Sequence, residues 1–334
     1  IGQKLGFRSG DIIFGKRRAY QRKLAVADCD GICSAHAMVL RAKTELVEPD
    51  FLPFFMQSDM FMGRAVDISV GSLSPTINWK TLRIQEFPLP PKAEQRQIIT
   101  LLIAAEETID SHLRSQHALQ VARKVVVFQS LANLASRASV DGQVTMRTVG
   151  DACHQVTDGT HFTPTYVPEG VPFLRVTDIQ DIAIDWSSAM RIPYEEHVEL
   201  CKRCKPQKGD VLLSKNGTIG ITKVVDWEKE FSIFVSLCLL KPKSCVLPEY
   251  LREVLRSGFA QKQFARRSKQ GTVNNLHLVE IRECRIPVPS ITEQKRLISA
   301  TKSFDDSLVA AEHAIAGLRN IKKQLIADFM QRSR

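Results

Sequence analysis

The chain has 334 residues, enough for two or three domains. Its 44% hydrophobic and 25% charged residues are typical of a folded soluble protein and exclude a largely disordered chain. No apolar run approaches the roughly 18 residues of a membrane span, so we expect no membrane partner. A formal net charge of +10 favours an anionic partner, and nucleic acid is the first candidate.

The start of the chain and its cysteines bear on where the protein works. The chain does not open with Met and shows no secretory signal, so we expect a fragment of a longer, cytoplasmic protein. Cys201 and Cys204 form a C-x-x-C that follows His197, but no second such motif supplies the remaining zinc ligands. Whether they bind a metal stays open. The simplest expectation for the eight cysteines is reduced thiols.

The stretch GDIIFGK at residues 10–16 is similar to a nucleotide-binding P-loop but lacks its chemistry. Arg17 stands where a P-loop has the Ser or Thr that binds magnesium. The apolar residues Ile12, Ile13 and Phe14 favour a strand over a loop that cradles phosphate. We therefore predict a strand that runs into a basic loop.

The chain contains a tandem duplication. GDIIFGK at 10–16 returns as GDVLLSK at 209–215, and FPLPPKAEQRQI at 87–98 returns as IPVPSITEQKRL at 286–297. Matching positions in the two copies differ by 199 (209 − 10). Positions related in this way are called repeat-equivalent below. The second unit opens near residue 148, and no counterpart of residues 148–199 precedes residue 1, so the first unit is expected to lack its N-terminal half.

Each unit begins with a strand-rich part. Short apolar runs such as DIIF, FLRV and DVLLS are separated by Gly, Pro, Asn and Asp, which predicts short strands joined by turns. A short amphipathic helix is expected near residues 49–66 and again near 248–268. A Pro-flanked strand follows in both units, and it must avoid a sheet centre because proline lacks a ladder donor.

A long helix closes each unit, near residues 93–134 and 292–331, where no proline interrupts a sequence rich in good helix formers. In the second helix, apolar residues recur at spacings of three and four, with Lys322 as the polar exception. These seam residues are Phe304, Leu308, Ala311, Ile315, Leu318, Leu325 and Phe329. The equivalent positions of the first helix, whose seam should be weaker or differently phased, include His112, Gln116 and Arg123. We predict that the helices pack against each other as a rod of roughly 60 Å.

This layout resembles the specificity (S) subunits of type I restriction-modification systems, and the resemblance covers essentially the whole chain. The motifs that carry it are GDIIFGKRRAYQRKLAVAD at 10–28, VGSLSPTINW at 70–79, PLPPKAEQRQI at 88–98, DGTHFTPTY at 158–166 and PVPSITEQKRLI at 287–298.

The resemblance implies an α+β fold that is a pseudo-twofold tandem repeat. Two mixed, strand-rich target recognition domains, the first truncated at its N-terminus, are joined by two long antiparallel coiled-coil helices. The expected ranges are 1–91 for the C-terminal part of the first recognition domain, 92–134 for the first long helix, 135–147 for a connector, 148–290 for the second recognition domain and 291–334 for the second long helix.

The resemblance also implies a function. Each recognition domain would read one half of a split target in double-stranded DNA, while the helices set the gap and bind two modification (methyltransferase) subunits. Restriction subunits would complete the complex. S-adenosylmethionine, ATP and Mg are expected on those partner subunits, and the chain itself is expected to hold no catalytic residue, metal or cofactor. The chain accordingly lacks N-P-P-[YF], a complete P-loop, G-x-S-x-G and H-E-x-x-H.

Candidate DNA contacts lie in polar and basic loops, because cations bind phosphates while bidentate polar groups read base edges. The strand at GDIIFGK and its repeat both run into such a loop, and the turn at Asp158 and Gly159 and the short Gly-hydroxyl loops at 71–72 and 271–272 add further candidates. The alternative is that these loops are simply solvated. The candidates are Lys16, Arg17, Arg18, Tyr20, Arg22, Lys23, Thr160, His161, Lys215, Asn216, Thr218, Arg266, Arg267, Lys269 and Thr272.

Two Glu-Gln pairs at the starts of the long helices are tempting as acid and base. A carboxylate at a helix start offsets the dipole and accepts from unpaired N–H groups, so capping and interface roles are favoured over catalysis. The candidates for helix packing and the subunit interface are Glu94, Gln95, Glu293, Gln294, Phe304, Leu308, Ile315, Leu318 and Leu325.

A second class of function stays open. The chain could be a degenerate S-like scaffold whose helices bind partner subunits while its domains no longer read DNA. Salt-dependent, sequence-selective DNA affinity would separate the two hypotheses. The bases that are read cannot be taken from the sequence.

Overall fold

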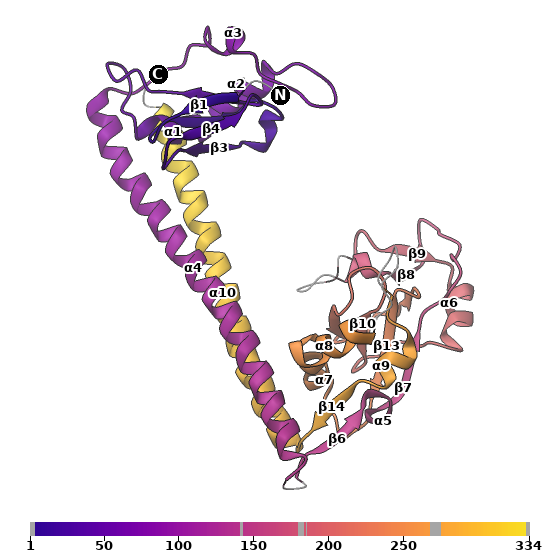
Figure 1. Cartoon of the computed structure of the whole chain (residues 1–334). Helices are drawn as coiled ribbons and strands as arrows, with labels where there is room; N and C mark the ends of the chain where they lie inside the picture. The colour runs from indigo at the N-terminus through magenta and orange to yellow at the C-terminus, as the bar shows by residue number, and fades with distance from the viewer. Residues whose placement is uncertain (1–3, 141–142, 180–183, 185, 268–274, 332–334) are drawn as a thin grey trace. The chain divides into compact units, whose positions relative to one another are not determined.

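The computed structural model describes residues 4–140, 143–179, 184, 186–267 and 275–331. The chain divides into two compact units: unit 1 comprises Ile1–His117 and Val309–Arg334, and unit 2 comprises Ala118–Leu308. The long helices α4 (Lys92–Arg137) and α10 (Ile291–Gln331) each contribute one half to each unit (Figure 1). The ranges expected from the sequence instead kept each long helix as a separate element.

Unit 1 is built on a small antiparallel sheet with the strand order β3-β2-β5, beside an antiparallel pair formed by β1 and β4. Ile12 and Phe14 of β2 point into the core because alternate side chains of a strand face the same side. The elements are β1 (Lys4–Phe7), β2 (Ile12–Gly15), η1 (Ala19–Gln21), β3 (Leu24–Val26), β4 (Gly31–Ser34), β5 (Ala37–Leu40), α1 (Phe51–Gln57), α2 (Asp59–Asp67) and α3 (Trp79–Leu82).

The core of unit 1 is rich in phenylalanine. The Phe55 ring lies 5.7 Å from that of Phe61 and 5.3 Å from that of Phe87. The C-terminal end of α10 belongs to this core, because Phe51 lies 6.2 Å from Phe329 and the buried Met330 joins the same cluster (Figure 1). Residues from both ends of the chain therefore share one core.

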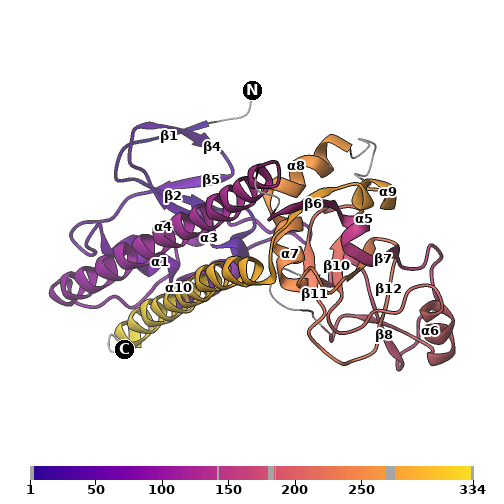
Figure 2. The same cartoon turned by 90° about the horizontal axis from the view of Figure 1, so that it is seen from below.

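Unit 2 contains a four-stranded antiparallel sheet with the order β11-β10-β13-β7, and two smaller sheets, β12-β8-β9 and β14-β6. All of β10 is buried, since Val211 and Leu213 face one apolar cluster and Leu212 faces another. Helix α7 packs on β10 and β11 (Figure 2). The strands are β6 (Thr145–Thr148), β7 (Cys153–Asp158), β8 (Val171–Leu174), β9 (Met190–Ile192), β10 (Val211–Ser214), β11 (Thr222–Val224), β12 (Ser232–Ile233), β13 (Leu237–Pro242) and β14 (Arg285–Val288). The helices are α5 (Val149–Ala152), η2 (Val176–Asp178), α6 (Tyr194–Cys201), α7 (Pro248–Arg256), α8 (Gly258–Arg267) and α9 (Leu278–Arg282).

The prediction of a single amphipathic helix in each unit is wrong in one respect, because each unit forms two helices there. Both pairs break at a serine with extended backbone, Ser58 between α1 and α2 and Ser257 between α7 and α8. The Ser58 hydroxyl accepts a hydrogen bond from the Phe61 N–H at 3.2 Å, which caps α2. These serines are repeat-equivalent, so the break belongs to the duplicated unit.

The Pro-flanked strand forms in unit 2 but not in unit 1. In unit 2 it is β14, which pairs with β6 alone and therefore tolerates its prolines. The repeat-equivalent segment at residues 86–89 has no strand partner in the described part of unit 1. The partner strand β6 (Thr145–Thr148) has no repeat-equivalent positions among the residues of this chain.

The long helices are confirmed, and α4 runs to Arg137, somewhat beyond its predicted end. In unit 1 Glu106 pairs with Lys322 and Gln116 lies 3.3 Å from Glu312. In unit 2 Arg123 pairs with Asp305 and Arg137 with Glu293, at 2.7 Å each, so the helices run antiparallel within each unit. Among the described residues, no helix is long and apolar enough to cross a membrane. The predicted seam residues are buried (Ile315) or half-buried (Phe304, Leu308, Leu318 and Leu325).

A buried glutamine ties the start of each long helix to the chain before it. The Gln95 amide accepts from the Glu48 N–H at 2.8 Å and donates to the carbonyls of Leu46 and Pro90 at 3.3 and 2.8 Å. Gln294 repeats all three hydrogen bonds at equivalent positions, with Leu247, Cys245 and Pro289 at 2.9, 2.8 and 3.0 Å. Neither glutamine is exposed, so each satisfies backbone groups that water cannot reach.

The Gln95→Ala substitution should destabilise the chain by about 2 kcal/mol or more, because it leaves a buried N–H and two carbonyls without their partner. Urea unfolding followed by circular dichroism measures this loss. Gln97→Ala is the matched control, since Gln97 lies on the same helix and is exposed. Equal unfolding midpoints for the two variants would show that the buried hydrogen bonds contribute little.

Candidate nucleic-acid interface

The Gly-Asp dipeptide before β2 in unit 1 and before β10 in unit 2 forms a turn that is held by hydrogen bonds. Gly10 and Gly209 have φ of 87° and 89°, a region that favours glycine. The carboxylate of Asp11 accepts from the Arg8 N–H at 2.8 Å, and that of Asp210 accepts from the Gln207 N–H at 2.7 Å. The predicted strand is confirmed as β2, so the stretch that is similar to a P-loop is a turn and a strand.

The basic loop after β2 is fixed to a second loop of unit 1. The Arg18 N–H donates to the Pro75 carbonyl at 2.7 Å, and Arg17 Nε donates to Ser74 Oγ at 2.8 Å. Ala19 is buried, whereas Arg18 is exposed and has a left-handed backbone with φ of 57°. The surrounding contacts must hold this conformation, which is uncommon for a residue other than glycine.

Most unit 1 candidates remain available to a partner. Arg17, Arg18, Tyr20 and Lys23 are exposed, and Lys16 is half-buried. Arg22 is also exposed but pairs with Asp59 at 2.6 Å, and Asp59 is shared with Lys323 at 2.9 Å. The loop therefore presents a group of cations beside an aromatic ring, a combination that suits a phosphate backbone.

In unit 2 the lysine that is repeat-equivalent to Lys16 is buried, whereas the sequence suggested an exposed lysine that contacts phosphate. Lys215 is only 5% exposed, and its Nζ lies 3.2 Å from Asp158 Oδ2. A carboxylate as deeply buried as Asp158 needs a counter-charge, and Lys215 supplies it. Thr160 is buried as well, and its hydroxyl lies 3.3 Å from the Phe162 N–H.

Asp158 is the centre of a cationic cluster. Its Oδ1 lies 3.2 Å from His161 Nε2 and 2.5 Å from Arg203 Nη2. Burial opposes ionisation of this carboxyl group, but the hydrogen bond from His161 and the charge of Lys215 hold its pKa below the ordinary value. His161 and Arg203 remain more than half exposed, so the cluster presents the Arg203 guanidinium to solvent. Sequence reasoning missed Arg203, because nothing local links it to Asp158.

The loop after each Gly-Asp strand meets the segment before the last short helix. In unit 1 the Ile77 N–H donates to the Lys16 carbonyl at 2.9 Å, and in unit 2 the Leu276 N–H donates to the Lys215 carbonyl at 2.9 Å. Isolated bridges join Arg17 to Thr76 and, at equivalent positions, Asn216 to Asn275. The two units therefore present the same pair of loops with different side chains.

The remaining unit 2 candidates lie at the same loops or on α8. Asn216 is half-buried and Thr218 is exposed. Arg266 and Arg267 are exposed at the end of α8, where Arg267 pairs with Glu283 at 3.1 Å. Lys269 and Thr272 lie outside the described residues.

The C-x-x-C motif lies on and just after α6. Cys201 Sγ lies 3.5 Å from His197 Nε2, while His197 Nδ1 is 2.9 Å from Ser232 Oγ. Burial raises the pKa of the Cys204 thiol to about 12. Across the described part of the chain, no three His, Cys, Asp or Glu side chains group as a metal site requires.

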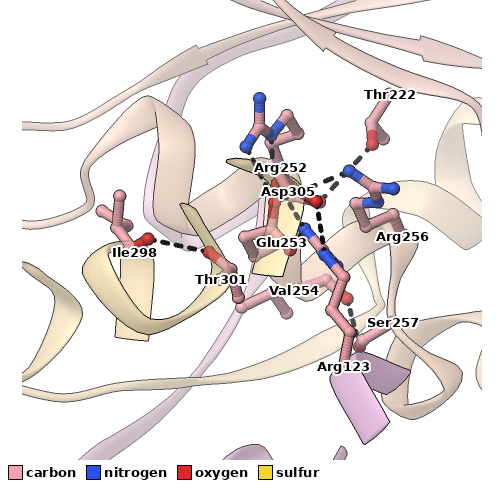
Figure 3. A network of polar contacts seen from close by, with 10 residues as sticks. All are labelled: Arg123, Thr222, Arg252, Glu253, Val254, Arg256, Ser257, Ile298, Thr301 and Asp305. Atoms are coloured by element: carbon pink, nitrogen blue, oxygen red, sulfur yellow. Dashed lines mark hydrogen bonds and ion pairs between the residues drawn. The ribbon is translucent and has the colours of Figure 1, made fainter. Parts of the chain in front are cut away.

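An arginine on α4 joins three helices of unit 2 (Figure 3). Arg123 donates to Asp305 of α10 at 2.7 and 3.0 Å and to Glu253 of α7 at 2.9 Å. Arg252 and Arg256 also approach Glu253, at 2.8 and 3.7 Å. Glu253 is completely buried, so its charge depends on these arginines.

Unit 1 has a related contact at repeat-equivalent positions. Lys322 of α10 pairs with Glu106 of α4, where unit 2 has Arg123 and Asp305. The Lys322 ammonium also lies 5.2 Å from the centre of the Phe54 ring and 3.3 Å from the side-chain amide oxygen (Oε1) of Gln57. Phe54 is repeat-equivalent to Glu253, so a cation–π contact replaces an ion pair.

The Glu-Gln pairs at the helix starts have different environments. Glu94 is exposed, whereas Glu293 pairs with Arg137 and accepts from Ser290, contacts that lower its pKa. Gln95 and Gln294 are buried by their own chain, which fits helix packing and leaves them no surface for a partner.

Comparison with known proteins identifies one family. The family model described as "Type I restriction modification DNA specificity domain" matches residues 2–120 and 143–316. The Escherichia coli type I restriction enzyme EcoBI specificity subunit is 22% identical over 276 residues, which span 74% of this chain and 58% of that protein. The MjaVIII specificity subunit of Methanocaldococcus jannaschii is 20% identical over 96% of this chain and 75% of its own.

Solved structures share the fold. A chain from a structure on complex assembly and conformational transition of the type I R-M system has a TM-score of 0.66 at 21% identity, covering 97% of this chain and 82% of that chain. The HsdS subunit from Thermoanaerobacter tengcongensis has a TM-score of 0.51 at 21% identity over 98% of this chain and 82% of its own.

The arginines around Glu253 lead to a stability prediction. Glu253→Gln keeps the shape of the side chain but removes the charge that neutralises them, so unit 2 should lose about 3 kcal/mol. Tryptophan fluorescence during urea unfolding measures this in a Trp79→Phe background, which retains only Trp186 and Trp227 of unit 2. Glu249→Gln on the exposed face of α7 is the control. An unchanged midpoint for Glu253→Gln would contradict a structural role for the ion pairs.

Proposed function

Because the chain belongs to the family of type I restriction-modification specificity subunits, we propose that it is the non-catalytic, sequence-reading subunit of a type I complex. Each recognition domain reads one half of a split target in double-stranded DNA. The long helices set the gap between the halves and bind two modification (methyltransferase) subunits.

One observation carries the proposal: the same pair of loops recurs in both units with different side chains. Arg17 bridges to Thr76 in unit 1, and Asn216 bridges to Asn275 at the equivalent positions of unit 2. Arginine and asparagine prefer different base edges, guanine and adenine respectively. Two similar surfaces with different reading groups are what a split target with unlike halves requires.

The chemistry is assigned to partner subunits. S-adenosylmethionine belongs to the modification subunits, and ATP and Mg belong to the restriction subunits that cleave. The specificity subunit contributes position, since it holds the complex at one sequence, and we assign this work to the cytoplasm.

Methylation in cells tests this function. Cells that express this chain within its full reading frame, together with a modification subunit of the same system, should gain a split methylated motif with a fixed central gap on both strands. Cells without the chain are the control. If no motif appears although the modification subunit co-purifies with the chain, the chain is a scaffold that binds partners without reading DNA.

The helices should act as a ruler. One extra heptad inserted after Gln116 of α4, with a matching heptad before Glu312 of α10, keeps the seam in phase and lengthens both helices by roughly 10 Å. The gap in the methylated motif should then grow by about three base pairs, at roughly 3.4 Å each, while both half-sites stay the same.

A heptad inserted in α4 alone is the control, because it breaks the pairing of the two helices and should abolish methylation. A gap that stays the same in the doubly extended protein would rule out the helices as the spacer.

A further inference from the structure

Arg203 follows α6, and both of its terminal nitrogens are held in place. Nη2 donates to Asp158 Oδ1 at 2.5 Å, and Nη1 donates to the Gly159 carbonyl at 3.3 Å. The side chain nevertheless remains 54% exposed. A guanidinium carries five N–H donors, so the remaining ones point away from these two acceptors.

The two acceptors are themselves fixed. Asp158 ends β7, is paired with Cys238 of β13, and has its second oxygen held by Lys215. Gly159 lies so close to Ile233 that an added Cβ would be 1.9 Å from the Ile233 carbonyl oxygen, so no larger residue fits there. The plane of the Arg203 side chain is therefore set by the core of the domain.

Lys202, the residue before Arg203, is held less firmly than Arg203, because its partner is exposed. Lys202 pairs with Glu199 at 2.6 Å, and both side chains are about two-thirds exposed. Such a solvated pair has no fixed orientation. Arg203 instead lines a cavity of about 340 Å³ together with His161, which gives a ligand room to approach it.

A fixed, exposed guanidinium suits base reading better than phosphate binding. A phosphate is bound well by a flexible lysine, whereas guanine presents O6 and N7 in one plane to a bidentate arginine. Fixing the arginine beforehand reduces the entropy lost when it binds and makes the contact geometrically selective.

We propose that Arg203 reads a guanine in the half-site recognised by the second domain, positioned for this by Asp158. The inference rests on the proposed function and adds to it a specificity-determining residue. Lys215 acts through Asp158 as a positioning residue, because its Nζ holds the second carboxylate oxygen at 3.2 Å.

The first test is the methylome of the Arg203→Ala variant, which removes the guanidinium; lysine would be a poor substitute, because its ammonium can also donate to guanine O6 and N7. One G·C pair of the second half-site should become degenerate, with discrimination against other bases reduced about tenfold or more. The first half-site is the internal control and should not change. Lys202→Ala is the matched control, and its motif should remain that of the unmodified protein.

The second test changes the DNA rather than the protein. A duplex that carries the motif with 7-deazaguanine at that position lacks the N7 acceptor. The complex with the unmodified chain should bind it about tenfold or more weakly than the guanine duplex, whereas the Arg203→Ala complex should bind both about equally.

Two results would overturn the assignment while leaving the proposed function intact: an unchanged motif in the Arg203→Ala variant, with affinity lost equally at every sequence, or a second half-site with no guanine on either strand. The first would identify Arg203 as a phosphate contact. If the unmodified chain directs no motif at all, the proposed function fails and this inference fails with it.

Discussion

A positive charge in the seam between two helices must be neutralised nearby, because water is largely excluded there. Both halves of the helix pair meet this constraint at the same repeat position, with Arg123 facing Asp305 and Lys322 facing Glu106. Each pair joins α4 to α10, so both are satisfied only when the helices run antiparallel in this register. A shift by one heptad would separate both cations from their carboxylates.

Side-chain packing around these charges has diverged between the units, while the backbone contacts have not. Phe128 of unit 2 has the Lys262 ammonium 4.6 Å from its ring centre, whereas the repeat-equivalent Ala327 of unit 1 lines a cavity of about 550 Å³. The three hydrogen bonds of Gln95 recur unchanged at Gln294. The duplicated unit has therefore kept its hydrogen bonds to the backbone, while its surface and its side-chain packing have changed.

The features that could be predicted from the sequence are those with a local or periodic signal. The duplication, the long helices and the seam around Ile315 depend on spacing along the chain, and the structure agrees with them. The break at Ser58 was missed, because a serine within an amphipathic pattern does not by itself end a helix.

The candidate site was harder to predict, because its side chains come together from distant segments. Lys215 follows a strand and looked like an exposed cation, but its partner Asp158 lies on another strand of the same sheet. Arg203 meets that carboxylate across 45 residues of sequence. Burial and partners of this kind follow from tertiary packing and not from residue type or spacing.

Unit 1 consists of two segments that are far apart in the sequence, and this affects when it can fold on the ribosome. Its core includes Phe329 and Met330, which are synthesised only after all of unit 2 has been made. Unit 2 is continuous in sequence and can form as soon as residues up to 308 have emerged. Unit 1 can therefore be completed only after unit 2 has been synthesised, although most of its residues come first in the sequence. Until the C-terminal part of α10 emerges, Phe51 and its apolar neighbours lack part of their cover and remain open to contacts with other chains.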